Sequence, residues 1–391
     1  MLDFSYEQVN QFVLQKQHLT ENTISNDIEQ ITKDIGGLHS TNQTTPYLSL
    51  FNRISDFTKN QLDEKVYIEK NLGKIRSTRK TVFIHHKEYV PWIINATKNQ
   101  YLKRHDDYLA YLGISEEKYQ QIIKKILSVL EGRSLSVSEI KKELNSRENI
   151  SAMVNLACDE FKIIRTKPIK SWRDRRHTYS SFVEHFPDID LKIHSEKESK
   201  TKLVKYYIEC FGPVSENDIV WWTGFNKTET RQALEDIQED LTKIYFKETE
   251  QELYILAAQL EKLKQTSIPS NSIINILPEL DSYLMGYKER DRYINQSKYD
   301  HMFDRSGNAT ATILLNGQVK GIWDFISSGE STIKFFLFEK LESKLLDNIQ
   351  TKLQAIGKFI FEEEAKLKEC ESMKPLKTRT PGEVQTPLKN C

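Results

Sequence analysis

The stretch Ile122-Ile123-Lys124-Lys125-Ile126-Leu127 opens a pattern that recurs at Leu203-Val204-Lys205-Tyr206-Tyr207-Ile208. Each copy predicts a helix, a short turn with a glycine (Gly132 or Gly212), two further helices and a β ribbon. This order is typical of the winged helix, a helix-turn-helix module with a β hairpin appended. Two such modules in one chain favour nucleic-acid binding over other functions.

The composition is typical of a soluble globular protein with an ordinary hydrophobic core. Its 391 residues suffice for two to four domains, and 38% of them are hydrophobic. The 56 basic and 56 acidic residues cancel, so any surface that binds nucleic acid must be local. No run approaches the roughly 18 apolar residues of a membrane span, and the N-terminus lacks the features of a signal peptide.

The cysteines argue against metal or redox chemistry. Cys158, Cys210, Cys370 and Cys391 are scattered, and none forms a CxxC pair. We expect Cys158 and Cys210 to be small buried hydrophobes, because both lie on apolar helical faces. The sequence therefore predicts a cytoplasmic protein without metal or cofactor.

The pattern along the chain predicts a mainly α structure of the α+β class, with tandem modules and a small C-terminal β domain. Asn316-Gly317 is a strong signal for a two-residue hairpin turn within that β domain. We expect the following segments: 1–112, a divergent winged helix; 113–190 and 199–265, the two clear winged helices; 270–338, the β domain; 339–373, a long helix; and 374–391, a disordered tail.

The densest basic segment lies in the ribbon of the first clear repeat, between Phe161 and Ser180. A β wing can straddle a DNA groove, and cations on it would contact phosphates. The alternative is a solvated hairpin paired with acids elsewhere. We expect DNA contacts, and a possible wedge in Trp172, from these residues: Lys167, Lys170, Trp172, Arg173, Arg175 and Arg176.

A second basic cluster precedes the strand-like run Thr81–His85. Arg76 and Arg79 are its candidate DNA contacts, although charge runs of this kind are more often solvent-exposed faces. Helices before this strand would complete the third, more divergent winged helix.

Several blocks together resemble one known family. They are GPVSENDIVWWTG at 212–224, LPELDSYLMGYKER at 277–290, FDRSGN at 303–308, GIW at 321–323 and RSTRKTVF at 76–83. They occur in the family's order over nearly the whole chain. The chain is thereby similar to the winged-helix DNA-binding family that contains the AlkZ-like bacterial DNA glycosylases.

The resemblance implies three tandem winged helices in a C-shaped clamp, followed by a β-barrel-like domain. In the glycosylases of this family the clamp embraces duplex DNA. Those enzymes release N7-alkylated purines, some unhook interstrand crosslinks, and they need no metal. We accordingly expect a monomer whose partner is alkylated or crosslinked double-stranded DNA.

The family's catalytic motif is Gln-x-Gln, placed after the second helix. Its positions fall here on His39 and Thr41, so the chain departs from the pattern there. Gln15-Lys16-Gln17 also has the motif's form but lies one helix too early. A His-Ser-Thr-Asn turn ahead of Pro46 could equally be ordinary helix capping.

His39 and Thr41 nevertheless suit the chemistry. An N7-alkylated purine is already cationic and leaves readily, so the protein must mainly hold a water and stabilise oxocarbenium charge. A neutral imidazole can hold that water and accept its proton. No lysine in the motif offers a Schiff base, which favours a monofunctional glycosylase. A non-catalytic DNA-binding protein and a protein-interaction scaffold remain alternatives.

Overall fold

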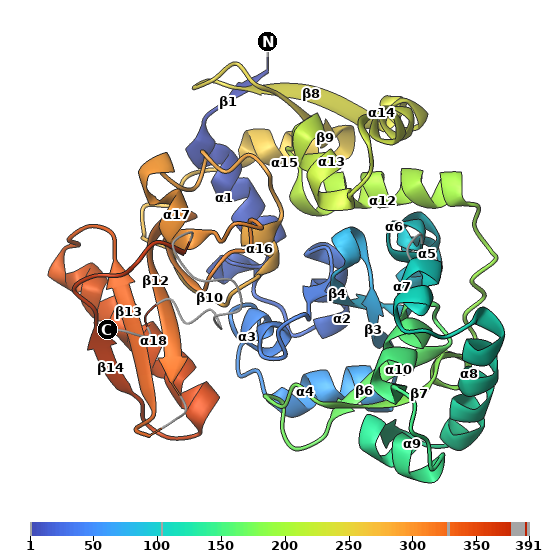
Figure 1. Cartoon of the computed structure of the whole chain (residues 1–391). Coiled ribbons are helices and arrows are strands. Elements are labelled where there is room, and N and C mark those ends of the chain that lie inside the picture. Colours follow the sequence, from blue (N-terminus) through green and yellow to red (C-terminus); the bar gives the residue numbers. More distant parts are fainter. Residues whose placement is uncertain (1, 103–104, 327–328, 377–387, 389–391) are drawn as a thin grey trace.

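The computed structural model describes residues 2–102, 105–326, 329–376 and 388. Helices alternate with strands that form four small sheets, so the predicted α+β class is confirmed. Figure 1 shows the five-stranded sheet of β10 to β14 on one side and β6 and β7 on the other, with α2 to α4 and β3 between them. No helix in the described ranges combines the length and apolarity needed to cross a membrane.

The N-terminal region runs helix, strand, helix, helix, hairpin. Asp27 begins helix α2 by accepting a hydrogen bond from the backbone N–H of Gln30 at 3.0 Å. Gly36 and Gly37 follow with φ of 79° and 89°, which ends the helix. The sheet has the order β2-β4-β3. The elements are α1 (Tyr6–Lys16), α2 (Ile28–Asp34), β2 (Leu38–His39), α3 (Thr45–Phe51), α4 (Lys59–Asp63), β3 (Leu72–Arg76) and β4 (Val82–His86).

The first clear repeat has the same element order and its own core. Ser136 and Glu139 form a reciprocal capping box at the start of α9. Its sheet order, β5-β7-β6, matches that of the N-terminal sheet. The elements are α8 (Glu116–Leu130), β5 (Leu135–Ser136), α9 (Val137–Glu143), α10 (Ile150–Asp159), β6 (Ile163–Pro168) and β7 (His177–Ser181).

The second clear repeat is completed by the beginning of the chain. β1 pairs in parallel with β8, so the third sheet has the order β1-β8-β9. Helices α12, α13 and α14 each start with a capping box, at Ser195, Ser215 and Asn226. The elements are β1 (Asp3–Phe4), α12 (Glu196–Phe211), α13 (Glu216–Thr223), α14 (Lys227–Asp236), β8 (Leu241–Phe246) and β9 (Glu252–Leu256).

The C-terminal region is an open sheet and not a closed barrel. Its five strands pair in linear order, and no pairing joins β10 to β14 among the described residues. The predicted turn at Asn316-Gly317 is confirmed: both residues have positive φ, 51° and 77°, as a type I′ hairpin turn requires. The strands are β10 (Ile274–Leu277), β11 (Thr312–Leu315), β12 (Gln318–Ile326), β13 (Thr332–Leu337) and β14 (Lys366–Glu369).

The long helix predicted at 339–373 is shorter than expected. Helix α18 spans Ser343–Phe361 and ends where Glu362 adopts a left-handed φ of 63°. The chain then returns as β14, which pairs in parallel with β13. Most of the tail predicted to be disordered, 377–387 and 389–391, lies outside the described residues.

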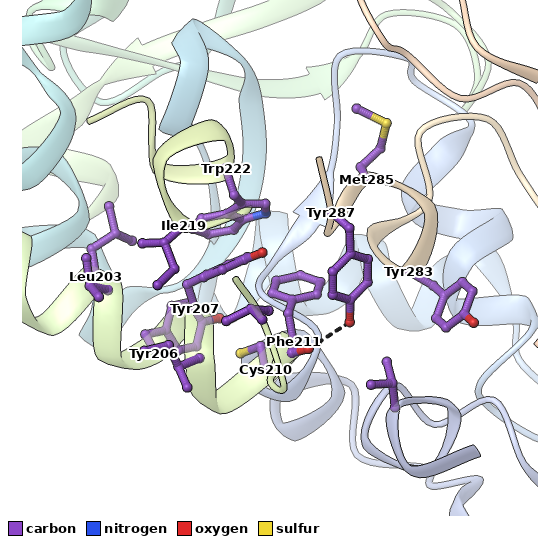
Figure 2. Packing of buried hydrophobic residues seen from close by; sticks show 14 of the residues in the cluster. Leu203, Tyr206, Tyr207, Cys210, Phe211, Ile219, Trp222, Tyr283, Met285 and Tyr287 are labelled. Atoms are coloured by element: carbon purple, nitrogen blue, oxygen red, sulfur yellow. Dashed lines mark hydrogen bonds between the residues drawn. The ribbon is translucent and has the colours of Figure 1, made fainter. Parts of the chain in front are cut away.

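Aromatic packing joins the second clear repeat to the C-terminal region. Tyr207 stacks on Trp222 with ring centroids 4.9 Å apart, and the Tyr287 hydroxyl donates to the Phe211 carbonyl at 2.8 Å (Figure 2). The linking helices are α5 (Val90–Thr97), α6 (Asn99–Leu102), α7 (His105–Tyr111), α11 (Phe182–His185), α15 (Ala257–Gln265), α16 (Ser282–Met285) and α17 (Tyr299–Met302). Short 3-10 or π turns lie at Glu21–Thr23, Glu64–Ile68, Thr78–Lys80, Lys87–Tyr89, Gln238–Asp240 and Gln296–Lys298.

Candidate functional site

The turn that carries the candidate catalytic residues lies between β2 and α3. His39 pairs with Phe83 of β4, and the Ser40 N–H donates to the Val82 carbonyl at 2.8 Å. The chain then leaves the sheet edge. Asn42 accepts hydrogen bonds from the N–H and the hydroxyl of Thr44, each at 3.0 Å, which shapes the entry into α3. These contacts form a local Asx turn, whereas Thr44, the N-cap of α3, makes no side-chain capping hydrogen bond, so the expected helix capping is not seen here.

The structure places His39 and Thr41 in different surroundings. The His39 ring is 3% exposed and packs edge-on against Phe83, with ring centroids 4.8 Å apart. Burial, with a smaller effect of Arg79, lowers the pKa of His39 to about 3, so the imidazole is neutral at pH 7. Its Nδ1 is buried without a hydrogen-bond partner among the described residues. Thr41, in contrast, is exposed.

Glu279, from a distant part of the chain, faces this turn. It follows β10, and its backbone carbonyl accepts a hydrogen bond from the Thr45 hydroxyl at 3.0 Å. Its carboxylate accepts a short hydrogen bond from the Asn42 side-chain amide. Burial and the nearby Asp324 raise the pKa of Glu279 to about 7, with Arg175 acting in the opposite direction. The sequence reasoning missed this residue, although it lies inside the family block at 277–290.

A buried ion pair fixes Glu279 relative to α3. The Arg53 guanidinium binds both carboxylate oxygens of Asp281 at 2.8 and 2.9 Å, and both side chains are fully buried. Ser49 donates to the same carboxylate at 2.6 Å. Because every partner is satisfied, this pair can hold the loop after β10 in one position. Asp281 is therefore engaged in structural contacts.

A buried lysine supports the turn from the other side. Lys74 on β3 is 4% exposed and donates to Oε1 of Gln43 at 2.9 Å. Burial, helped by the Arg165 guanidinium, lowers the pKa of Lys74 to about 7. The sequence motif contains no lysine; Lys74 comes near the turn from β3, which is separated from β2 by β4 in the sheet.

The basic cluster that precedes β4, with Arg76 and Arg79, is held by protein contacts. Arg76 donates from Nε to Asp159 of α10 at 2.5 Å and lies over the Tyr101 ring. Arg79 has a positive φ of 52°, and its guanidinium lies 3.8 Å from the centroid of the Trp221 ring. Both candidate DNA contacts thus occupy the junction between modules and are only partly exposed.

The densest basic segment lies on the hairpin of β6 and β7 and is open to solvent. Lys167, Lys170, Arg173, Arg175 and Arg176 are all exposed. Arg176 pairs with Asp174 at 2.8 Å, yet 61% of its side chain is exposed. An exposed cationic hairpin of this kind can contact a polyanion.

Trp172 anchors this hairpin to the rest of the molecule. Its ring lies 5.2 Å from that of Tyr47 in α3 and 5.8 Å from that of Phe359 in α18. The Lys59 ammonium lies 5.0 Å from its ring centroid. The residue proposed as a wedge is therefore packed against two other elements, and its ring joins the hairpin to α3, the helix that follows the candidate turn.

Comparisons with known proteins identify the family of this chain and a solved structure with a similar fold. The family model described as DNA glycosylase AlkZ-like matches residues 32–359. Among solved structures, the Streptomyces sahachiroi DNA glycosylase AlkZ has a similar fold, with a TM-score of 0.75 and 15% sequence identity. That match covers 94% of this chain and 100% of the other. No curated protein matches the chain. The family match spans most of the sequence, so this chain belongs to the AlkZ-like DNA glycosylase family.

Proposed function

We propose that this DNA glycosylase hydrolyses the N-glycosidic bond of N7-alkylated purines in double-stranded DNA. Alkylation at N7 makes the purine cationic, and its departure neutralises that charge. The enzyme then needs no strong acid at the base. It must position a water and stabilise the developing oxocarbenium ion, which the polar turn at 39–45 and the adjacent carboxylate are suited to do.

The observation that carries this proposal is the proximity of the exposed cations to the turn. The Trp172 ring of the β6–β7 hairpin lies 5.2 Å from that of Tyr47 in α3, and the exposed Arg175 follows three residues later on the same hairpin. A duplex whose phosphates bind the hairpin would therefore lie beside Thr41, Asn42 and Glu279. This placement supports a winged-helix mode of binding, in which the hairpin acts as the wing.

Within the turn, we assign different roles to the two motif residues. Thr41 is exposed and can offer its hydroxyl to the substrate or to a bound water. His39 is a positioning residue, because its neutral ring is enclosed against Phe83 beneath the turn. Lys74 is enclosed as well, and its ammonium is used by Gln43, which supports a monofunctional enzyme over a lyase.

The test is release of 7-methylguanine from methylated duplex DNA by the wild type, Thr41→Ala and His39→Gln. We expect release by the wild type and about fivefold slower release by Thr41→Ala, which loses one hydrogen bond worth about 1 kcal/mol. His39→Gln should stay active, because the buried amide is also neutral. Salt-sensitive duplex binding without release by the wild type would instead support a non-catalytic DNA-binding role.

A further inference from the structure

Glu279 has the position that a catalytic carboxylate requires. Two hydrogen bonds, from Asn42 to its side chain and from Thr45 to its backbone, tie it to the candidate turn. The buried pair of Arg53 and Asp281 fixes the same loop two residues further on. Glu279 is intermediate between buried and exposed, whereas Asp281, two residues further on, is fully buried.

We propose that Glu279 is the general base of this glycosylase and accepts the proton of the water that attacks C1′ of the damaged nucleotide. The assignment rests on the proposed function and identifies the residue that performs its central step. It also explains how the chain can depart from the Gln-x-Gln motif, since the water would be held by Glu279 together with Asn42.

The other ionisable groups near the turn are less suited to this role. His39 is enclosed, and both oxygens of Asp281 are occupied by Arg53. In Glu279, Oε1 accepts from Asn42, and in the part of the chain that the structure describes no hydrogen bond is donated to Oε2. Oε2 is thus the oxygen that can accept a proton from a water.

The step balances without any co-reactant except water. The water oxygen forms a bond to C1′, and the bond from C1′ to N9 of the purine breaks. The electron pair of that bond goes to N9 and neutralises the N7-alkylated base, which leaves. The proton lost by the water goes to Oε2 of Glu279, and the resulting carboxylic acid later returns it to solvent. The products are an abasic sugar and a free alkylpurine.

The charged neighbours of Glu279 shift the pKa of its carboxyl in opposite directions. Asp324 on β12 raises its pKa and Arg175 on the hairpin lowers it, while burial has the largest effect. A base must be deprotonated to act, so the rate should fall as the pH drops through about 7. Removing the Asp324 charge should move this fall to lower pH, and removing the Arg175 charge should move it to higher pH.

The experiment is a single-turnover pH–rate profile for 7-methylguanine release by the full-length wild type and Glu279→Gln, Asp324→Asn and Arg175→Gln. We expect Glu279→Gln to be about 100-fold slower at pH 8 and to lose the fall in rate below pH 7. Its affinity for duplex should be unchanged or slightly higher, because a negative charge near the DNA is removed. Asp324→Asn and Arg175→Gln should shift the midpoint in opposite directions.

The controls separate the possible failures. Ionisation of the methylated base would appear equally in every variant, whereas titration of Glu279 would disappear only in Glu279→Gln. Glu252→Gln, on β9, is the matched amide control and should behave as the wild type, and all variants should retain the wild-type melting temperature. Release by the wild type with an unchanged profile in Glu279→Gln would overturn the assignment alone. No release by the wild type would overturn the proposed function together with it.

Discussion

The β3–β4 and β6–β7 hairpins have the same place in sheets of the same strand order, and both carry a cluster of cations. In the first, Arg76 is paired with Asp159 and Arg79 is stacked on Trp221. In the second, Lys167, Lys170 and Arg175 point to solvent. Clusters of cations in corresponding hairpins thus have different surroundings: one joins modules, and the other is exposed to solvent.

The difference follows from what each hairpin touches. The β3–β4 connection contacts helix α13, so its cations face Trp221 and the aromatic core. Outside its own module the β6–β7 hairpin contacts β3, and its Trp172 ring packs between Tyr47 and Phe359. The cations on either side of Trp172 remain exposed. A basic cluster indicates DNA contact only once its surroundings are known.

The largest expected effect is on DNA binding by the second hairpin. Reversing the charges of Lys167, Lys170 and Arg175 to Glu should reduce affinity for duplex DNA at least about 100-fold. The slope of log K against log salt should fall by about 0.9 for each lost phosphate contact. The measurement is duplex binding by fluorescence anisotropy over a salt series, with thermal unfolding as a check on the fold.

The matched control is charge reversal at three exposed lysines in the same module, Lys124 and Lys125 on α8 and Lys141 on α9. That variant should bind DNA within a few-fold of the wild type. Equal loss of affinity in both variants would mean that net charge, and not the hairpin, determines binding.

The next effect concerns how the second hairpin is held. Trp172→Ala should lower the free energy of unfolding by about 2 kcal/mol, since a half-buried ring loses its contacts with Tyr47 and Phe359. It should also make the hairpin more sensitive to limited proteolysis, while Trp172→Phe should restore most of the loss. An unchanged unfolding midpoint in Trp172→Ala would show that the hairpin is not anchored there.

The smallest expected effect is on stability at Arg79 in the β3–β4 hairpin. Two substitutions there distinguish backbone strain from loss of side-chain stacking. Arg79→Ala and Arg79→Gly both lose the contact with Trp221, but only glycine adopts the positive φ of 52° at no steric cost. We expect Arg79→Ala to be less stable than Arg79→Gly by about 1 kcal/mol in urea denaturation. DNA affinity should change little in either variant. A large loss of DNA affinity in both variants would show that Arg79 contributes to DNA binding.

Local signals predicted much of the fold. The Asn316-Gly317 turn acts over a few residues, so the sequence reveals it directly. The end of α18 was not predicted, because Glu362 gives no glycine signal and β14 depends on pairing with β13. The open five-stranded sheet likewise depends on which strand edges meet, which local patterns do not encode.

The candidate site was predictable only in part, for a similar reason. The motif positions His39 and Thr41 could be located by order along the chain, but the burial of His39 depends on Phe83 in another strand. Glu279 is more than 200 residues from Asn42 in sequence, and only the folded chain brings them together. Its raised pKa also needs Asp324, from yet another strand.

The most direct test of this account is a crystal structure of the protein bound to a duplex that contains a 1-azaribose nucleotide. The cationic nitrogen of that sugar stands in for C1′ of the oxocarbenium ion. We predict that a water held by Asn42 and Oε2 of Glu279 contacts this nitrogen, with neighbouring phosphates on Lys170 and Arg175. An azaribose bound elsewhere, for example in the 370 Å³ cavity lined by Gln15, Lys16 and His18, would contradict the account.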